Sequence, residues 1–351
     1  MTSPRLTPAI DVDRLAEWMD SVGIIESGPL HVRYIAVGTQ NEIFEVRRGE
    51  RHMVLRKPPP NAAPGRDKGI LREWQVLAAL KGTDVPHADP VALCADASVL
   101  GRPFYLMGFV DGWSPMSAAG TRGVVEPFLS DPSLRPGLAR ELVRGAALLA
   151  GVDWRAAGLT GFGRPEGFHD RQVDRWLEFH RNARGRVVPG MDVATKWLRR
   201  HRPIDFVPGI MHGDYQFGNV MFAHGAPGRL AAIVDWEMAT IGDPKLDLAA
   251  CLRDWPDRGV PTAGIASTVD IAGMPPRDEL TAHYAEVSGR QVDDFDYYLV
   301  LARWKLAIVL EQGYQKAGED QVLQGFAAIV EDLMRQAADL AESTPYAVGG
   351  A

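Results

Sequence analysis

One short stretch constrains the fold of this 351-residue chain more than any other. Residues 210–222 read IMHGDYQFGNVMF, in which His212, Asp214 and Asn219 form a His-x-Asp-x4-Asn pattern between two apolar runs. A turn rich in Gly and Pro follows, and a further apolar run then ends directly in Asp235. Apolar runs joined by such a turn are typical of a β-hairpin. The hairpin would bring Asp235 back beside Asn219.

The residue types in this pattern suit phosphoryl transfer, in which the protein mainly orients the nucleophile and neutralises charge on the phosphates. Asp214 is the candidate to orient an acceptor hydroxyl and take its proton. Asn219 and Asp235 are the candidates to hold Mg²⁺, because this cation prefers hard oxygen ligands and keeps several waters. An isolated His-Gly-Asp is usually only a turn, but the complete spaced set is specific. His212 fits a structural role that holds the loop.

These motifs resemble those of the aminoglycoside phosphotransferase and choline kinase superfamily. The run VDWEMATIGDP at residues 234–244 is similar to one branch in particular. That branch contains bacterial proteins named aminoglycoside phosphotransferases by likeness, and the kinase-like part of some acyl-CoA dehydrogenase family proteins. The resemblance extends from about Val37 onward. It implies ATP and Mg²⁺ as cofactors and an α+β, protein-kinase-like bilobal fold, but it leaves the phosphate acceptor open.

In such a fold the N-terminal lobe is a five-stranded antiparallel sheet with a helix, and the C-terminal lobe is mainly helical. We expect the first lobe at residues 1–110, a hinge at about 107–112 and the second lobe at 111–351. Alternating and apolar runs predict strands at residues 31–37, 42–46, 51–56, 91–94 and 103–107. Helical spacing predicts a helix at 67–80, with Asp67 as its N-cap.

The resemblance also places residues around the nucleotide phosphates. Arg56 stands where the third strand of related kinases carries a Lys, and Lys57 lies beside it. Because strand side chains alternate between faces, only one of the two can face the cleft, and we expect it to be Arg56. Its guanidinium can bind phosphate through several donors. Glu73, on the helix that follows, matches the acidic partner of this cation.

Two backbone segments complete the expected nucleotide site. Gly38 and Thr39 begin a polar link between the first two strands, whose amides could cover the phosphates; alone, such a link is more often a plain hairpin turn. Met107, Gly108 and Val110 lie in the expected hinge. By resemblance, the carbonyl of Gly108 and the amide of Val110 hold adenine.

From residue 136 onward the sequence pattern is mainly helical. We expect a helical region at 138–157 with a break at Gly151, and closing helices at 278–288, 293–314 and 320–342. After Asp235 a helix begins near residue 244. By resemblance, Asp247 on that helix accepts hydrogen bonds from the backbone of the catalytic loop.

Composition excludes several classes of protein. A net charge of −7 argues against nucleic-acid binding, and 46% apolar residues with 24% charged residues is ordinary for a globular chain. No apolar run approaches the length of a membrane span, and the N-terminus lacks the apolar core of a signal peptide. The two cysteines, Cys94 and Cys251, are isolated from each other. We therefore expect a cytoplasmic protein with neither a disulfide framework nor a zinc site.

The sequence favours an ATP- and Mg²⁺-dependent phosphotransferase that acts on a hydroxyl of a small molecule. A non-catalytic nucleotide-binding regulatory module with the same fold is the alternative, and the replacement of Lys by Arg56 supports it. A metal hydrolase built on the His and Asp residues is a third and weaker interpretation. The identity of the acceptor, the preference for ATP over GTP, a role in antibiotic resistance and the oligomeric state stay open.

Overall fold

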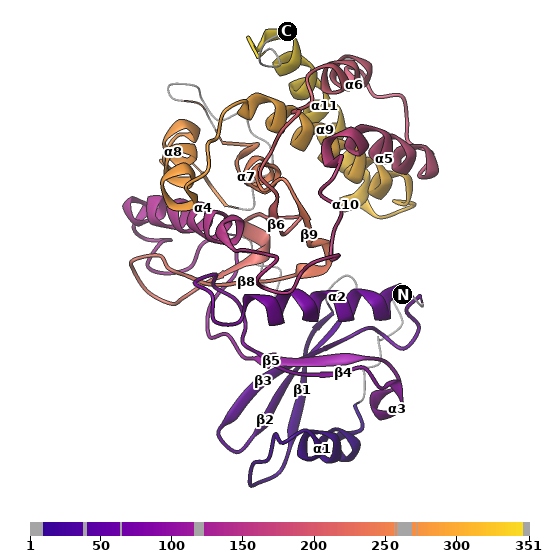
Figure 1. Cartoon of the computed structure of the whole chain (residues 1–351), viewed down its shortest axis with the longest axis vertical. Coiled ribbons are helices and arrows are strands. Elements are labelled where there is room, and N and C mark those ends of the chain that lie inside the picture. Colours follow the sequence, from indigo (N-terminus) through magenta and orange to yellow (C-terminus); the bar gives the residue numbers. More distant parts are fainter. Residues whose placement is uncertain are drawn as a thin grey trace.

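The computed structural model describes residues 10–37, 41–63, 65–115, 123–255, 257, 269–271 and 273–346. The chain forms two lobes stacked along its longest axis (Figure 1). The N-terminal lobe contains a five-stranded sheet, and the C-terminal lobe is mainly helical. The predicted α+β bilobal architecture is confirmed.

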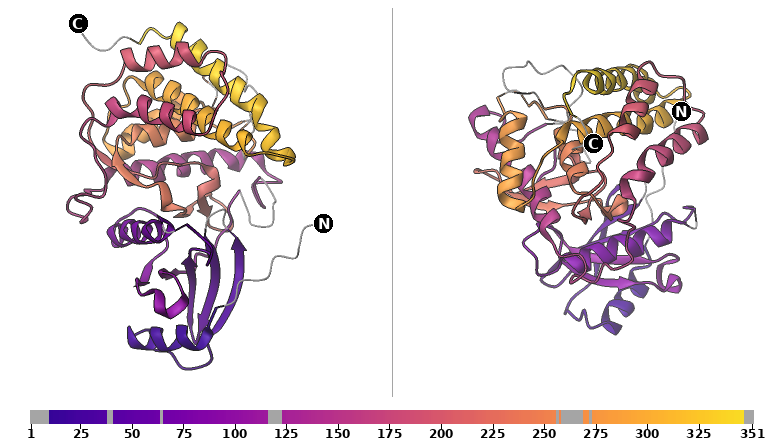
Figure 2. Two further views of the ribbon diagram at one scale, coloured as in Figure 1. Left: turned by 90° about the vertical axis from the view of Figure 1, so that its right-hand side faces the viewer. Right: turned by 45° about the horizontal axis from the view of Figure 1, so that its top comes forward.

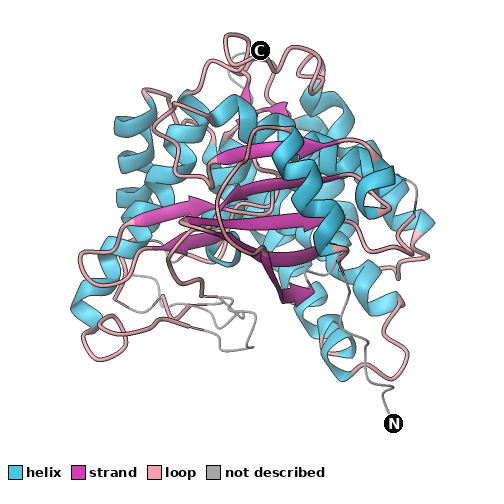
Figure 3. Cartoon of the chain, turned by 90° about the horizontal axis from the view of Figure 1, so that it is seen from below, coloured by secondary structure: helices cyan, strands magenta, loops and turns pink. Residues whose placement is uncertain are grey.

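The N-terminal sheet has the strand order β1-β2-β3-β5-β4, and every neighbouring pair is antiparallel. Figure 3 shows its strands side by side. The five expected strands are all present, with bounds close to those predicted. They are β1 (His31–Val37), β2 (Glu42–Arg48), β3 (Arg51–Lys57), β4 (Pro90–Cys94) and β5 (Phe104–Gly108).

One face of the sheet is covered by α1 (Val12–Ser21), which begins at an N-cap, Asp11, whose carboxylate accepts a hydrogen bond from the Arg14 amide at 3.1 Å. This helix is amphipathic, so it buries Leu15 and Met19 in a small core with apolar side chains of the sheet. A short helix, α3 (Ala97–Leu100), lies between β4 and β5 in the sequence. This core is separate from the cleft between the lobes.

The other face of the sheet is covered by α2 (Gly65–Leu80), which lies between the sheet and the C-terminal lobe (Figure 1). The prediction that Asp67 caps this helix was wrong. The helix begins at Gly65, so Asp67 lies in its first turn, where its carboxylate accepts a hydrogen bond from Arg102 Nε at 2.8 Å. Glu73 lies mid-helix and is only 1% exposed.

The helices of the C-terminal lobe pack around two apolar cores, one of which also includes Tyr105 and apolar side chains of α2 from the N-terminal lobe. Figure 2 shows this helical lobe above the N-terminal sheet. Its helices are α4 (Arg135–Gly151), α5 (Phe168–Asn182), α6 (Met191–Arg200), α7 (Lys245–Leu252), α8 (Arg277–Ser288), α9 (Phe295–Gln315), α10 (Gln321–Gln324) and α11 (Phe326–Ser343), with a 3-10 turn, η1 (Pro132–Leu134), before α4. Within the described residues, no helix is long and apolar enough to cross a membrane.

Two small antiparallel sheets lie on the side of this lobe that faces the cleft. One pairs β6 (Gly209–Met211) with β9 (Thr240–Gly242), and the other pairs β7 (Val220–Phe222) with β8 (Leu230–Ile233). Two short 3-10 turns, η2 (Phe217–Asn219) and η3 (Trp236–Met238), complete the region. The loop that contains His212, Asp214 and Asn219 therefore has short strands on either side of it, β6 before it and β7 after it.

The chain passes between the lobes immediately beside β7. The backbones of Trp113 and Phe222 exchange two hydrogen bonds, both of 2.8 Å. A Cβ added to Gly112 would lie 2.6 Å from the Phe222 carbonyl oxygen, so this close approach requires glycine. A second backbone contact joins the lobes, because the Ile233 amide donates to the Pro86 carbonyl at 2.9 Å. The contact with Pro86 fixes the β7–β8 hairpin against the N-terminal lobe.

Candidate active site

His212 holds the loop that carries Asp214. Its imidazole Nε2 lies 2.8 Å from the Val234 carbonyl oxygen, and the Asp214 amide donates to Nδ1 at 3.3 Å. A carbonyl only accepts and an amide only donates, so the pair of contacts fits a neutral ring with its proton on Nε2. The side chain is fully buried. His212 therefore connects the loop to the hairpin through hydrogen bonds of both ring nitrogens, and neither nitrogen is free for proton transfer.

Asp247, on α7, holds the backbone of the same loop. One carboxylate oxygen accepts from the His212 amide at 2.5 Å and the other from the Gly213 amide at 2.9 Å. Burial raises the pKa of Asp247, although the nearby His212 and the two amides oppose this effect. Gly213 has a φ of +85°, and a Cβ there would lie 2.4 Å from the Met238 carbonyl oxygen. The loop thus takes a path that only glycine allows.

The carboxylate of Asp214 projects from this loop and is exposed. The side-chain amide nitrogen of Asn219 donates to the Asp214 carboxylate and to its backbone carbonyl, both at 2.8 Å. Gln216 Nε2 donates to the other carboxylate oxygen at 3.0 Å. The alternate residues Tyr215 and Phe217 are buried and anchor the loop in the core. Asp214 is therefore pre-oriented by amide donors while it stays open to the cleft.

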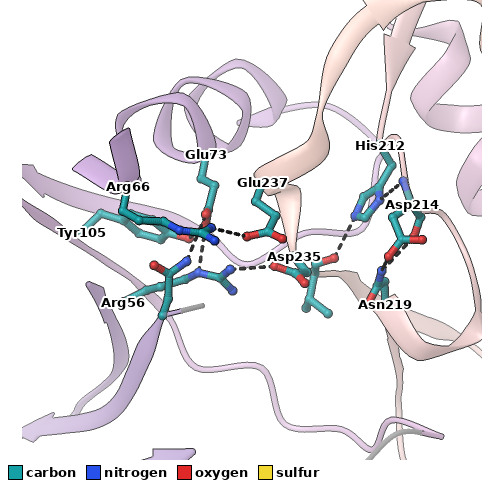
Figure 4. A network of polar contacts seen from close by, with 11 residues as sticks. Arg56, Arg66, Glu73, Tyr105, His212, Asp214, Asn219, Asp235 and Glu237 are labelled. Atoms are coloured by element: carbon teal, nitrogen blue, oxygen red, sulfur yellow. Dashed lines mark hydrogen bonds and ion pairs between the residues drawn. The ribbon is translucent and has the colours of Figure 1, made fainter. Parts of the chain in front are cut away.

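The predicted hairpin returns Asp235 to the neighbourhood of Asn219. Val220 pairs with Ile233 in the β7–β8 ladder, and the Val234 amide donates to the Asn219 carbonyl at 2.9 Å. Asp235 follows directly and has left-handed backbone angles, with φ 68° and ψ 61°. Asp tolerates this conformation better than most residues. The resulting kink turns its side chain out of the hairpin toward the N-terminal lobe (Figure 4).

The donor set at this point fits a Mg²⁺ ion. The amide nitrogen of Asn219 is used on Asp214, which leaves Oδ1 on the opposite edge of the amide group. Asp235 supplies a carboxylate that is 39% exposed. One amide oxygen and one partly exposed carboxylate match the preference of Mg²⁺ for hard ligands. Among the described residues, no cluster of three or more His, Cys, Asp or Glu side chains forms a different metal site.

Arg56 connects the two lobes across the cleft. Its Nε lies 2.9 Å from Glu73 Oε2, and its Nη2 lies 2.6 Å from Asp235 Oδ1 (Figure 4). Glu73 also accepts hydrogen bonds from the Tyr105 hydroxyl at 3.0 Å and from Asn41 Nδ2 at 3.3 Å. A buried carboxylate needs such partners. The three donors hold Glu73 in position, and Glu73 in turn holds Arg56.

The two candidate cations of β3 point in different directions. Burial opposes the charge on Arg56, but Glu73, Tyr105 and Asp235 together outweigh this effect, and the pKa of Arg56 is raised above its ordinary value. Lys57 lies on the opposite face of the strand, with its Nζ 2.9 Å from Glu42 Oε2. Both contacts are nearly inaccessible to solvent. Arg56 is therefore the cation of β3 that faces the cleft.

The remaining candidate residues of the nucleotide site are backbone positions. Met107 and Gly108 end β5, and the Gly108 amide donates to the Asp89 carbonyl at 2.8 Å. The Val110 amide donates to no backbone carbonyl among the residues that the structure describes. Gly38 and Thr39 lie outside the described residues.

Sequence reasoning missed several residues that position the site. Arg72, one residue before Glu73, donates to the Phe162 carbonyl at 3.0 Å and to the Ala239 carbonyl at 3.2 Å. Its guanidinium carbon also lies 4.0 Å from the centre of the Phe162 ring. Tyr105 was assigned only to a strand. These contacts join positions that are far apart in the sequence, so no local pattern predicts them.

Glu237 forms a further contact between the lobes. Its Oε2 lies 3.5 Å from Arg66 Nη1, at the start of α2. Burial, followed by the negative charge of Asp235, raises the pKa of Glu237. Glu237 and Arg66 line a cavity of about 280 Å³ together with Asn41 and Glu73. The candidate site therefore extends beyond the predicted residues toward α2.

This fold and site define a class of protein, the kinase-like phosphotransferases. A model of the phosphotransferase enzyme family matches residues 31–280, which is most of the chain. A solved structure from Ralstonia eutropha, of a protein provisionally named an aminoglycoside phosphotransferase, superposes with a TM-score of 0.81 and 28% identity, covering 96% of this chain and 100% of the other. The chain belongs to the phosphotransferase enzyme family.

Curated relatives include longer proteins. Acyl-CoA dehydrogenase family member 10 of Mus musculus is 28% identical over 96% of this chain, and family member 11 of Homo sapiens is 29% identical over 94%. The chain spans only 31% and 42% of their respective lengths. An ethanolamine kinase of Plasmodium vivax shares the fold at 13% identity, with a TM-score of 0.51 over 94% of this chain and 85% of the other.

Proposed function

We propose that this protein transfers the γ-phosphate of ATP, in the presence of Mg²⁺, to a hydroxyl group of a small molecule. Membership of the phosphotransferase enzyme family supports the general reaction. One observation carries the finer proposal: Asn219 joins Asp214 to Asp235. The side-chain amide of Asn219 donates to the Asp214 carboxylate, and its backbone carbonyl accepts from Val234, the residue before Asp235.

In this proposal Asp214 is the catalytic carboxylate. It accepts a hydrogen bond from the acceptor hydroxyl, orients the oxygen toward the γ-phosphate and takes the proton as the bond forms. The amides of Asn219 and Gln216 keep the carboxylate in one orientation, so little reorganisation is needed when the acceptor arrives. Asn219 Oδ1 and the Asp235 carboxylate hold Mg²⁺, whose role is to neutralise charge on the phosphates.

The N-terminal lobe supplies the remaining contacts to the nucleotide. Arg56 presents its guanidinium to the phosphates, and Glu73 keeps it in place. We assign the loop at Gly38 and Thr39 to the phosphates as well. Adenine lies against the backbone of the hinge, at Met107, Gly108 and Val110. This assignment divides the chain into lobes at residues 1–110 and 111–351, with the hinge at 107–112.

The short stretch of chain between Asp235 and the next helix favours a small molecule as the phosphate acceptor. In protein kinases a long segment after this Asp helps to dock the peptide substrate. Here α7 begins at Lys245, with only η3 and β9 between it and Asp235. The chain therefore has little backbone at this point with which to hold a peptide.

Replacing Asp214 with alanine tests the proposal. ADP release would be measured with Mg²⁺ and ATP across a panel of hydroxyl compounds, and ATP binding by calorimetry. We expect transfer to be lost in Asp214→Ala while nucleotide binding is kept. Asp205→Asn, at an exposed position away from the site, is the matched control and is expected to retain activity.

Two results would contradict the proposal. Undiminished transfer in the Asp214 variant would remove this residue from the mechanism. If the unaltered protein binds Mg²⁺ and ATP but neither hydrolyses ATP nor transfers phosphate to any acceptor, the non-catalytic nucleotide-binding module becomes the better interpretation.

A further inference from the structure

The side chains that we assign to the metal and to the phosphates are bonded to each other. Arg56 donates a hydrogen bond from Nη2 to Asp235 Oδ1 at 2.6 Å, across the cleft between the lobes (Figure 4). The oxygen that accepts this hydrogen bond is one of the two with which Asp235 can hold Mg²⁺. In this structure, therefore, each residue satisfies the charge of the other.

Both residues of this ion pair are held in place from behind. Nε of Arg56 lies 2.9 Å from Glu73, whose side chain is 1% exposed. Asp235 follows β8, where the Val234 amide is bonded to the Asn219 carbonyl at 2.9 Å. The Arg56 side chain is 11% exposed and that of Asp235 is 39% exposed. Water and salt therefore screen this ion pair less than a pair on the surface.

The forked side chain of an arginine makes the double contact possible. Arg56 directs Nε toward Glu73 and Nη2 to Asp235, so two separate nitrogens meet the two carboxylates. A lysine has a single nitrogen at the end of a flexible chain. Arg56, at the position where related kinases carry a Lys, therefore reaches the candidate metal ligand without leaving its acidic partner.

A metal ion at Asp235 must compete with Arg56. At Oδ1 the ion has to displace the guanidinium, and at Oδ2 it shares a carboxylate with a positive charge that repels it. The carboxylates of Asp235 and Asp214 raise the pKa of Glu237, after burial, which is the larger cause, while Arg56 and Arg66 act in the opposite direction. Such a group of carboxylates attracts a cation, and Arg56 is the opposing charge in direct contact with the metal ligand.

Phosphate oxygens are suited to take Arg56 away from Asp235. They accept charge-assisted hydrogen bonds from a guanidinium, as a carboxylate does, and a triphosphate carries several negative charges. Nε can stay beside Glu73 while the far end of the guanidinium turns to its new partner. Asp235 then has both oxygens free to bind a cation.

From this arrangement, and resting on the proposed function, we propose that the Arg56–Asp235 ion pair closes the metal site in the nucleotide-free protein, and that the phosphates of ATP open the site by binding Arg56. Metal and nucleotide then bind with positive coupling, each raising the affinity for the other. In this account Arg56 controls metal binding, and its presence in place of Lys is no sign of lost activity.

Binding of Mn²⁺ to the nucleotide-free protein tests the proposal. Mn²⁺ replaces Mg²⁺ because unbound Mn²⁺ is measured directly by electron paramagnetic resonance. The decisive variant is Arg56→Met/Glu73→Gln, which removes the guanidinium together with its buried partner and leaves the net charge of the chain unchanged. Glu73→Gln alone is the matched control, because it keeps Arg56 on Asp235. We expect the double variant to bind Mn²⁺ about tenfold more tightly than the control, the effect of removing one positive charge beside the ion.

Two further measurements locate the effect. Adding Asp235→Asn to the double variant should cancel the gain, because the freed carboxylate is then gone. With a non-hydrolysable ATP analogue bound, the gain should largely disappear, because the phosphates have already taken Arg56 from Asp235 in the control. If the double variant does not fold, Arg56→Lys answers the same question, because its single nitrogen is drawn to the buried Glu73 and should give a gain in the same direction.

The proposal is overturned if the variants without Arg56 bind Mn²⁺ no more tightly than the control, if the gain survives Asp235→Asn, or if the gain is just as large with the analogue bound. Failure of the proposed function gives a different result. The coupling between Mn²⁺ and nucleotide would then be present, but ADP release would be absent with every hydroxyl compound.

Discussion

Replacing Arg56 with methionine should destabilise the N-terminal lobe by leaving a buried carboxylate without its cation. The Arg56 side chain is 11% exposed and that of Glu73 is 1% exposed, and their charged atoms are 2.9 Å apart. Removing one partner of a buried ion pair typically costs about 3–5 kcal/mol. Tyr105 and Asn41 still donate to Glu73 in this variant and reduce the loss of stability. We therefore expect a cost near the lower limit, about 3 kcal/mol.

A double-mutant cycle separates this ion pair from general packing effects. In Arg56→Met/Glu73→Gln the buried charge is gone, and the glutamine oxygen can still accept from Tyr105. The double variant should therefore be more stable than the sum of the single variants predicts, with a coupling free energy of at least about 1.5 kcal/mol. Arg51→Met is the control, because Arg51 is 44% exposed on the same strand, its partner Glu26 is also partly exposed, and its loss should cost less than about 1 kcal/mol.

The assay is urea unfolding followed by circular dichroism and tryptophan fluorescence. Coincident transitions would justify the conversion to a free energy of unfolding. The reasoning is refuted if Arg56→Met lies within about 1 kcal/mol of the unaltered protein, or if the double variant is simply additive.

Two further predictions follow from the N-terminal lobe. Arg72→Met removes two hydrogen bonds that join α2 to the C-terminal lobe, so it should cost about 2 kcal/mol in unfolding free energy and raise the KM for ATP. Lys68→Met is the control, because Lys68 is exposed on the same helix. Equal KM values in the two variants would contradict the role of Arg72. Arg47 and then Arg33 lower the pKa of Glu45 from 4.5 to about 2, so its ionised form stabilises the fold above pH 4.5 and this contribution is lost as the pH falls toward 2. Glu45→Gln should therefore be less stable than the unaltered protein at neutral pH, with a difference that narrows below pH 4.5; a difference that stays constant down to pH 2 in urea unfolding would count against this assignment.

The parts of the site that depend on local spacing could be predicted from the sequence. The interval from Asp214 to Asn219 fits one short loop, and the turn before residue 230 returns the chain through a hairpin, so the approach of Asp235 to Asn219 follows from hydrogen bonds between neighbouring strands. The expected support from Asp247 is also present, as two hydrogen bonds to the loop backbone. Alternation along β3 correctly separated Arg56 from Lys57.

Contacts between distant segments could not be predicted in the same way. Tyr105 and Asn41 meet Glu73 only because β5, β2 and α2 converge, and nothing in their local sequence marks them as partners of a carboxylate. Lys305 reaches the loop from another helix, α9, more than 90 residues away in the sequence. The helix expected at 320–342 is divided into α10 and α11 at Gly325. The sequence does not reveal this break, because the apolar period continues across the glycine.

A crystal structure with Mg²⁺ and a non-hydrolysable ATP analogue tests the central claim most directly. We expect the ion to be bound by oxygens of Asn219 and Asp235 at about 2.0–2.1 Å, with the Asp214 carboxylate open toward the γ-phosphate. A cation bound at another place, or an Asp214 side chain turned away from the γ-phosphate, would contradict the assignment of this crevice as the site of phosphate transfer.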